Sequence, residues 1–305
     1  MRTDSDKVEG VVELGDTHSA LTVAPTAGAR LMTWRVEGRD ILYWPEQYDL
    51  SEPAKIRGGN PLLFPFLGRH RVGDVPNHWQ DSEGVVRPLP QHGFARDLPF
   101  AHTVSDDGKA ITLTLASSAA TRDDYPFEFI FDVTYRLDGN ALDVIFDTRN
   151  TGDKAMPYYA GHHFYFALPH ALRTESRLHL PPTQRCEQRP DGSITPVQAE
   201  PEDYYPGDPQ IQDRFHVLGN TGPRSPVTLH TPSLGRTISI TLDQPDTAPW
   251  YAVTTWTLAD ESDFYCVEPW LGLPNAIHHG QGLRWIAPGQ AEQARCRLHV
   301  RFDSQ

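Results

Sequence analysis

The sequence predicts an all-β protein, built as one large antiparallel two-layer β-sandwich that spans residues 1–305. Residues 110–115 alternate apolar and polar side chains, which is typical of a half-buried strand. Residues 129–135 and 141–146 flank a segment that contains Asp138 and Gly139, and this arrangement predicts a tight antiparallel hairpin. No linker or low-complexity tract divides the chain, so a single domain is the economical interpretation.

Further strands are predicted on both sides of this hairpin. Between residues 8 and 44, short β-prone pieces alternate with turns rich in Gly, Asp and Pro, and no helix is indicated. Residues 45–57 are polar and irregular, which favours a surface loop. Residues from about 170 to 224 are rich in Pro, Asp, Glu and Gln, so we expect long loops with short strands. The clearest later strand signals are at residues 214–218, 236–242, 251–256 and 295–302.

Composition limits the classes of function. A formal net charge of -13 argues against nucleic acid and anionic membranes as partners, because both favour clustered Lys and Arg. No apolar run is long enough to cross a bilayer and the first residues are too polar for a signal peptide, so a cytoplasmic protein is expected. Cys186, Cys266 and Cys296 are far apart and odd in number, which predicts packing residues rather than disulfides or a zinc cage.

Residues 264–270 contain the first candidate for chemistry. Aromatic and β-branched residues predict a buried strand here, with Glu268 at its end, directly before Pro269. Proline pushes the residue before it out of the α region, so Glu268 should be extended and Trp270 should face the same way. A carboxylate beside an indole suits a sugar site, although an inert, salt-bridged glutamate would give the same pattern.

Two other segments carry candidate binding residues. Residues 58–69 are apolar but contain Pro61 and Pro65, which cannot donate to a β-ladder, and buried irregular backbone often lines a site. Arg69 leaves this segment after a glycine. His92 precedes another glycine, which leaves room for a ligand close to the backbone. The alternatives are a solvated arginine and a hydrogen-bonded structural histidine.

The adjacent His162 and His163 suggest a metal site, but strand geometry argues against one. Successive side chains of a strand point to opposite faces, so the two rings should not enter the same site. The same argument applies to His278 and His279 if that segment is extended. With no other dense spacing of His, Asp and Glu, we expect no metal, while ligands from distant segments remain possible.

Four short blocks and a closing turn occur in order between about residues 58 and 290. They are Gly58 to Arg69, His92 to Arg96, His163 to Phe166, Val267 to Gly272, and Trp285 to Gly289. In this combination the chain resembles the aldose 1-epimerase (galactose mutarotase-like) family. Within it, the resemblance is to the divergent branch of epimerase-related and hexose-6-phosphate epimerase-like proteins.

The resemblance implies a galactose mutarotase-like supersandwich whose concave face binds a pyranose, without a cofactor. It implies that Arg69 and His92 hold sugar hydroxyls, that His163 is the general acid and that Glu268 is the general base. Asp213 corresponds to a family aspartate that binds hydroxyls. The family block has His-Pro or His-Thr where this chain has a His-Phe pair, and His163 is chosen because of its spacing to the aromatic residues that follow.

The implied reaction is the interconversion of α and β anomers of an aldose or aldose phosphate. A base takes the proton of the anomeric hydroxyl and an acid protonates the ring oxygen. At the ordinary pKa of about 4.3 Glu268 would be ionised at neutral pH, and a histidine near about 6.5 can give a proton. A non-catalytic sugar-binding or regulatory module is the main alternative. A glycosidase or lyase ranks lower, because hydrolysis needs two carboxylates and only one stands in a convincing block.

The sequence leaves the substrate open between a free and a phosphorylated sugar. Arg69, Arg71 and Arg96 are able to hold a phosphate if they converge, but arginine also binds neutral hydroxyls. The candidates for stacking on a sugar face are Trp79, Trp270 and Trp285, with core packing expected for most of them. We assign Trp270 to substrate binding because it lies beside Glu268.

Overall fold

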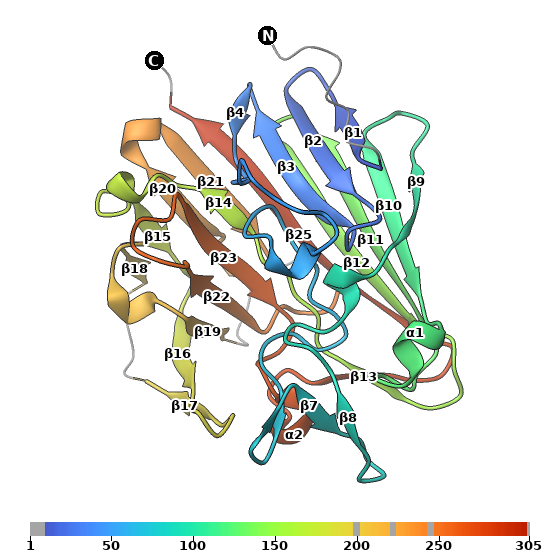
Figure 1. Cartoon of the computed structure of the whole chain (residues 1–305). Helices are drawn as coiled ribbons and strands as arrows, with labels where there is room; N and C mark the ends of the chain where they lie inside the picture. Colours follow the sequence, from blue (N-terminus) through green and yellow to red (C-terminus); the bar gives the residue numbers. More distant parts are fainter. Residues whose placement is uncertain (1–9, 198–201, 220–223, 243–246, 304–305) are drawn as a thin grey trace.

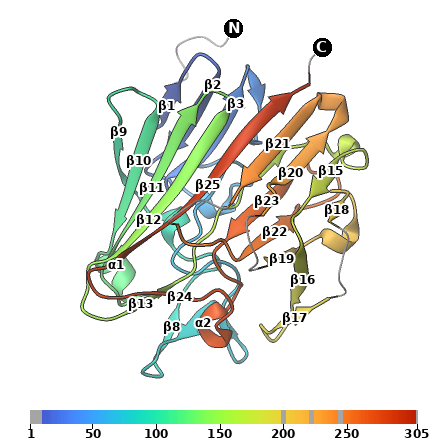
Figure 2. The ribbon, with the colours of Figure 1, turned by 180° about the vertical axis from the view of Figure 1, so that it is seen from behind.

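A computed structural model describes residues 10–197, 202–219, 224–242 and 247–303. Its strands form two facing layers (Figures 1 and 2). One layer is a single nine-stranded sheet, and the other contains a four-stranded and a six-stranded sheet. The prediction of an all-β antiparallel sandwich is therefore confirmed.

The nine-stranded sheet contains the longest strands, and every paired neighbour in it is antiparallel. In spatial order its strands are β18 (Asp203–Tyr204), β15 (Arg177–His179), β20 (Val227–Thr231), β21 (Arg236–Thr241), β25 (Ala291–Phe302), β12 (Ala141–Asn150), β11 (Phe129–Asp138), β10 (Ala110–Ala116) and β9 (Ala101–Val104). The predicted hairpin is β11 and β12, which pair from Phe129↔Asn150 to Asp138↔Ala141. The strand predicted at residues 110–115 is β10.

The opposite layer carries the segment around Glu268. Its six-stranded sheet contains, in spatial order, β14 (Tyr165–Ala167), β23 (Phe264–Trp270), β22 (Ala252–Trp256), β19 (Arg214–Leu218), β16 (Thr183–Gln188) and β17 (Ile194–Pro196). Its four-stranded sheet contains β1 (Val12–Gly15), β2 (Ser19–Ala24), β3 (Arg30–Val36) and β4 (Arg39–Asp40). All seven residues of β23 are buried, as the sequence predicts.

Short elements complete the described chain. The paired strands are β13 (Met156–Tyr158) with β24 (Arg284–Ile286), β5 (Arg71–Val72) with β6 (Val75–Pro76), and β7 (His78–Gln80) with β8 (Val86–Pro88). The α-helical turns are α1 (Ala119–Arg122) and α2 (Ala276–His279). The 3₁₀ turns are η1 (Pro53–Lys55), η2 (Ala95–Asp97), η3 (His170–Leu172), η4 (Pro209–Ile211) and η5 (Pro232–Leu234).

The core lies between the two layers. Phe131, Val133 and Tyr135 alternate with less buried residues along β11, so they point to one face and belong to the main buried cluster. Trp34 of β3 and Leu21 of β2 belong to the same cluster, from the other layer. Apolar burial on this scale stabilises the sandwich at roughly 25 cal/mol per Å², and it gives the site a rigid floor.

The segments predicted to be irregular are largely so. Residues 60–68 are buried and form only isolated bridges, such as Leu63↔Gly161 and Phe66↔Tyr159. The predicted surface loop at residues 45–57 contains η1 and two buried residues, Pro53 and Ile56. The loop-rich region after residue 170 contains the expected short strands, and its residues 198–201 and 220–223 lie outside the described residues.

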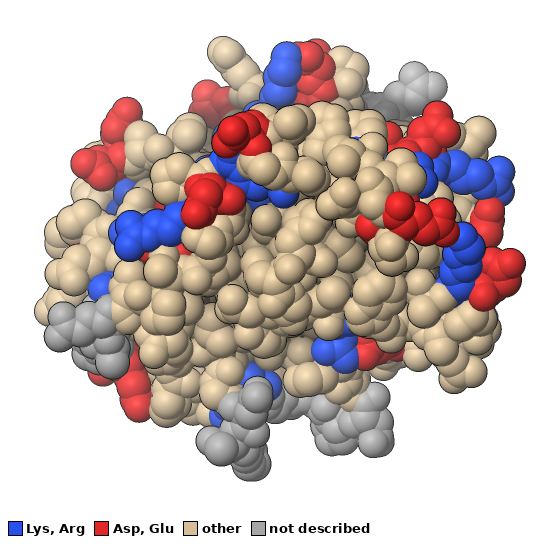
Figure 3. Space-filling view, turned by 90° about the horizontal axis from the view of Figure 1, so that it is seen from below, with Lys and Arg blue, Asp and Glu red and all other residues tan. Residues whose placement is uncertain are grey.

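Figure 3 shows the molecule from below the view of Figure 1, and this face carries both basic and acidic side chains. Basic and acidic side chains are interspersed there around a largely uncharged centre, and neither sign forms an extended patch (Figure 3). Within the described residues, no helix is long and apolar enough to cross a membrane.

Candidate active site

A pocket of about 240 Å³ opens over the six-stranded sheet. Its floor comes from β14, β22 and β23, and its walls come from residues 54–57, 68–69 and 91–96. The six residues that the sequence analysis assigned to a site all line this pocket: Glu268, His163, Arg69, His92, Asp213 and Trp270. The structure therefore brings them together, while their individual roles remain predictions.

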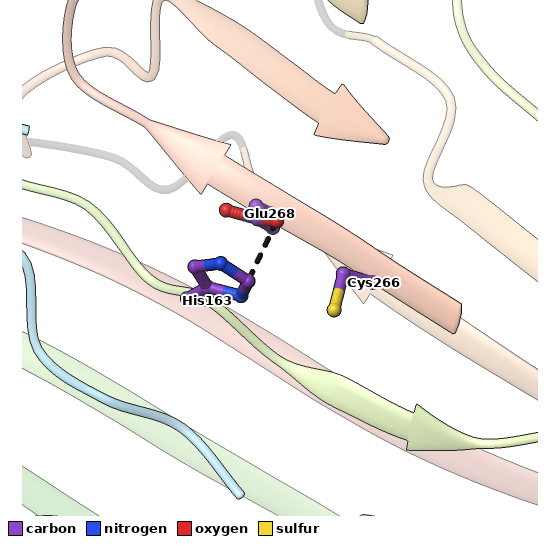
Figure 4. A group of neighbouring side chains, drawn as sticks. All are labelled: His163, Cys266 and Glu268. Atoms are coloured by element: carbon purple, nitrogen blue, oxygen red, sulfur yellow. Dashed lines mark ion pairs between the residues drawn. The ribbon is translucent and has the colours of Figure 1, made fainter. Parts of the chain in front are cut away.

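Glu268 and His163 face each other across two neighbouring strands. The register Tyr165↔Cys266 between β14 and β23, continued by two residues, places His163 opposite Glu268. His163 Nδ1 lies 3.3 Å from Glu268 Oε1 (Figure 4). The Tyr165 ring stacks on the His163 imidazole, with 4.7 Å between centroids and 8° between planes, and this contact restricts rotation of the imidazole.

His162 points to the other side of the layer, as alternation along an extended segment requires. Its ring is fully buried between Phe146, Phe164 and Trp250. His162 does not line the pocket, whereas His163 does. The expectation that only one of the two histidines enters the site is thus met.

Asn60 fixes the backbone and the ring of this histidine pair. Its Oδ1 accepts the His163 backbone N–H at 2.8 Å, and its Nδ2 lies 3.1 Å from His162 Nδ1. Because an amide nitrogen only donates, Nδ1 of His162 is the acceptor in this pair. Asn60 comes from the irregular segment that the sequence singled out, but its contact with the histidines was not predicted.

His92 is held in an unusual backbone conformation, with φ at +69°. Its Nδ1 accepts the Gly68 backbone N–H at 3.1 Å, and its own backbone N–H donates to the Gly68 carbonyl at 2.8 Å. The neutral ring therefore carries its proton on Nε2, and the Gln91 amide group 3.1 Å away accepts that proton only if its oxygen takes the position assigned to its nitrogen. In this tautomer Nε2 is a donor beside the pocket, which suits a sugar hydroxyl.

Arg69, Asp213 and Trp270 form the rim and one side of the pocket. Arg69 Nη1 lies 3.7 Å from Asp213 Oδ2, and both side chains are at least half exposed. An ion pair with that exposure contributes little stability and leaves both groups able to bind a ligand. Trp270 is buried, and its Nε1 donates to the His162 carbonyl at 3.2 Å, which fixes the indole at the edge of the site.

The other sequence candidates lie outside the pocket. Trp79 packs in the core against Phe66, and Trp285 is exposed without lining the pocket. Arg71 lines a second hollow, which adjoins the pocket at Arg69, and its Nε donates to the Gly73 carbonyl. Of the three arginines considered for a phosphate, only Arg69 and Arg96 line the pocket.

Several lining residues were missed by the sequence analysis, namely Arg30, Arg57, Tyr165, Thr254 and Trp256. Thr254 is opposite Glu268 in the register of β22 and β23, and its buried hydroxyl has no hydrogen-bond partner among the described residues. Only strand register identifies such a residue. Arg57 lies in the predicted surface loop, and nothing in its local sequence indicates that this loop covers the pocket.

Burial shifts the pKa values of Glu268 and His163 in opposite directions. Burial, with a contribution from the charge of Asp213, raises the pKa of Glu268 well above its ordinary value. Burial, with contributions from the Arg96 and Arg30 guanidinium groups, lowers the pKa of His163 well below its ordinary value. The ordinary values assumed from the sequence therefore do not apply. Both shifts favour the uncharged forms, a protonated Glu268 and a neutral His163; once charged, Glu268 is a stronger base and His163 a stronger acid than the free side chains.

In the described part of the chain, a single group of side chains has the composition and spacing for a metal ion. His163, Cys266 and Glu268 each offer one ligand atom, and these atoms lie within 4.8 Å of one another (Figure 4). The sequence argument against a metal concerned adjacent histidines, whereas this group joins residues from two neighbouring segments. All three cysteines are unpaired and buried, as expected of packing residues.

Comparison with known protein families gives a match over most of the chain. A family model described as aldose 1-epimerase matches residues 10–291. Protein LacX (chromosomal) of Lactococcus lactis subsp. lactis is 23% identical over 242 residues, which are 75% of this chain and 79% of LacX. A protein of Salmonella typhimurium named "Putative glucose-6-phosphate 1-epimerase" is 32% identical over 114 residues. That match spans 36% of this chain and only 34% of the Salmonella protein.

Solved structures share the fold at low sequence identity. The Slr1438 protein of Synechocystis sp. PCC 6803 has a TM-score of 0.82 at 24% identity, over 96% of both chains. A galactose mutarotase-like protein of Lactobacillus casei has a TM-score of 0.77 at 21% identity, over 96% of this chain and all of its own. These similarities establish a galactose mutarotase-like architecture for the chain.

Proposed function

Because this chain belongs to the aldose 1-epimerase family, we propose that it is a mutarotase, with Glu268 as the general base and His163 as the general acid. The observation that carries the proposal is the single pocket that contains both groups 3.3 Å apart, surrounded by the other four predicted site residues. A carboxylate and an imidazole at this spacing are suited to act on two oxygens of one sugar, since the anomeric hydroxyl and the ring oxygen share a carbon.

The proposed reaction needs only proton transfers. Starting from the charged pair, ionised Glu268 takes the proton of the anomeric hydroxyl while protonated His163 gives a proton to the ring oxygen, and the bond between C1 and that oxygen breaks. The resulting aldehyde rotates about the bond from C1 to C2. The same two residues, with their roles reversed, then close the ring on the other face. His92, Arg69 and Asp213 would hold the remaining hydroxyls during the rotation.

We further propose that the preferred aldose carries a phosphate. The residues that line the pocket include four arginines, Arg30, Arg57, Arg69 and Arg96, against the two carboxylates of Asp213 and Glu268. Nη1 and Nη2 of Arg30 donate to carbonyl groups of the chain, whereas Arg57 makes one such bond and is otherwise exposed. Arginine binds phosphate through two parallel hydrogen bonds. The name of the Salmonella relative agrees with this choice.

The test follows freshly dissolved α-D-glucose, α-D-galactose and α-D-glucose 6-phosphate to anomeric equilibrium by NMR or polarimetry. Wild-type protein should accelerate at least one of them, and Glu268→Gln should lose about 100- to 10,000-fold of that rate. Glu261 is exposed, so Glu261→Gln serves as a matched control and should keep the wild-type rate. Saturable sugar binding without acceleration would instead favour a binding module on the same fold.

A further inference from the structure

Cys266 lies next to the proposed catalytic pair but takes no part in the reaction proposed above. It precedes Glu268 by two residues on β23, so both side chains point to the same face of the strand. The thiol is fully buried, packed with Tyr165 and Phe264, and does not line the pocket.

The three side chains have the spacing of a metal-binding group. Zinc bonds of about 2.0 to 2.3 Å in a tetrahedral arrangement place neighbouring ligand atoms roughly 3.3 to 3.7 Å apart. His163 Nδ1 and Glu268 Oε1 are already at 3.3 Å. The Cys266 sulfur lies within 4.8 Å of the other ligand atoms, so a movement of about 1 Å would complete the set.

Two atoms of this group, His163 Nδ1 and Glu268 Oε2, lack hydrogen-bond partners within the described protein. Glu268 is 1% exposed and its Oε2 accepts no hydrogen bond, while His163 is 9% exposed and its Nδ1 makes none of acceptable geometry. Buried polar atoms without partners are costly, and each such atom calls for a ligand, an ion or a water. The charge also balances, because a thiolate and a carboxylate neutralise one divalent cation.

We propose that His163, Cys266 and Glu268 form a binding site for Zn²⁺, which reversibly inhibits the protein. The metal would reach the site from the pocket, which His163 and Glu268 line, and its fourth position would face that space. The thiol gives its proton to solvent when the Zn–S bond forms, and no electrons are exchanged. Inhibition rests on the proposed function, because the metal occupies the imidazole and the carboxylate that the reaction uses. Binding does not.

Binding is tested with Co²⁺, which gives a thiolate-to-metal charge-transfer band when a cysteine is bound. Wild-type protein should show the band at one Co²⁺ per chain, and added Zn²⁺ should remove it by displacement. Cys266→Ser should abolish it, and Glu268→Gln should weaken Co²⁺ binding at least about tenfold although the thiol remains. The control is Cys186→Ser, which removes another buried thiol and should leave the band intact. A band that survives in Cys266→Ser, or its absence from wild type, would overturn the proposal.

Inhibition is tested separately in the mutarotation assay. Zn²⁺ should slow wild type and Cys186→Ser equally, and a chelator should restore the rate. Relative to its own rate without metal, Cys266→Ser should need at least about tenfold more Zn²⁺ for half inhibition than wild type does. Equal Zn²⁺ sensitivity of Cys266→Ser and wild type would contradict inhibition through this site. If wild type proves inactive on every sugar, the proposed function fails, and the Co²⁺ spectrum still decides the metal site.

Discussion

The side-chain amide of Asn60 links the two histidines that alternate across the sheet, and it is the strongest candidate for a positioning residue. It accepts the His163 backbone N–H and donates to the ring of His162, so it holds the segment before β14 in place. The Tyr165 ring holds the His163 imidazole from the other direction. Together these contacts set the distance between His163 and Glu268 without touching the proposed reacting atoms.

We therefore expect Asn60→Ala to lower kcat by up to about 100-fold, because a displacement of about 1 Å at a reacting group has an effect of that size. KM should change little. Asn150→Ala is the control, since Asn150 is equally buried and donates to two backbone carbonyls away from the pocket. Both variants should lose stability in urea unfolding, but only Asn60→Ala should lose kcat. A rise in KM at unchanged kcat would contradict a positioning role.

The exposed guanidinium of Arg57 is the candidate for a direct contact with a phosphate. If it binds a phosphate, Arg57→Gln should raise KM for glucose 6-phosphate roughly 10- to 100-fold, since a hydrogen bond to a charged group contributes about 1.5 to 3 kcal/mol. KM for α-D-glucose should stay within about twofold. Arg149→Gln removes an arginine of β12 that does not line the pocket, and it should alter neither value. Equal effects of Arg57→Gln on both sugars would exclude a phosphate contact.

At the residue scale, the sequence identified the side chains that line the pocket better than it predicted their burial and their pKa values. Alternation along an extended chain correctly separates His162 from His163, because it depends only on neighbouring residues. The pKa shifts of Glu268 and His163 depend on burial by strands from the whole chain, so no local pattern reports them. Thr254 was missed because it meets Glu268 only through the register of two strands.

At the scale of elements, the turn that presents His92 is determined by a close backbone approach. Gly93 has φ at +74°, and a Cβ on it would stand 2.1 Å from the Phe64 carbonyl oxygen. The residues around Phe64 and Gly93 form an isolated parallel bridge, which holds two walls of the pocket together. The glycine after His92 is therefore required by packing, in addition to leaving room for a ligand.

Gly93→Ala should accordingly destabilise the protein well beyond the cost of its backbone conformation. Gly108→Ala is the matched control, because Gly108 has a similar φ of +67° but no atom near the added Cβ. The free energy of unfolding of the control, measured in urea, should fall by about 1 to 2 kcal/mol. Gly93→Ala should lose about 1 to 3 kcal/mol more, because the clash forces the backbone to move. Equal losses would show that the Phe64 carbonyl yields without cost.

Strands with strong local sequence signals were predicted well, but which distant strands pair with one another was not. The β11–β12 hairpin follows from a two-residue turn between alternating strands. In contrast, β25 lies between β12 and β21, and β14 lies beside β23, about 100 residues later in the chain. Such long-range pairings carry no local sequence signature. They could be expected only through the resemblance to a known family.

At the scale of the whole molecule, the two-layer core also encloses titratable groups that no proposed reaction uses. His216 of β19 is fully buried and its Nε2 lies 3.0 Å from the Thr255 hydroxyl. His70 is 2% exposed and packs edge-on against Phe66. Burial lowers the pKa of each imidazole to about 3, with the positive charge of Arg185 adding to the effect at His216. Both rings are therefore neutral in the folded protein at neutral pH.

Acid should unfold the protein through these histidines. In the unfolded chain each imidazole has a pKa near about 6.5, so its stabilising contribution is complete above that pH and declines as the pH falls toward about 3. Between pH 7 and pH 5 each should lower the free energy of unfolding by up to about 2 kcal/mol. His216→Gln should reduce the loss measured by urea unfolding by that amount, whereas the exposed His102→Gln should not change it. If His216→Gln leaves the slope unchanged, the buried ring is protonated in the fold, and acid must act on the sandwich through other groups.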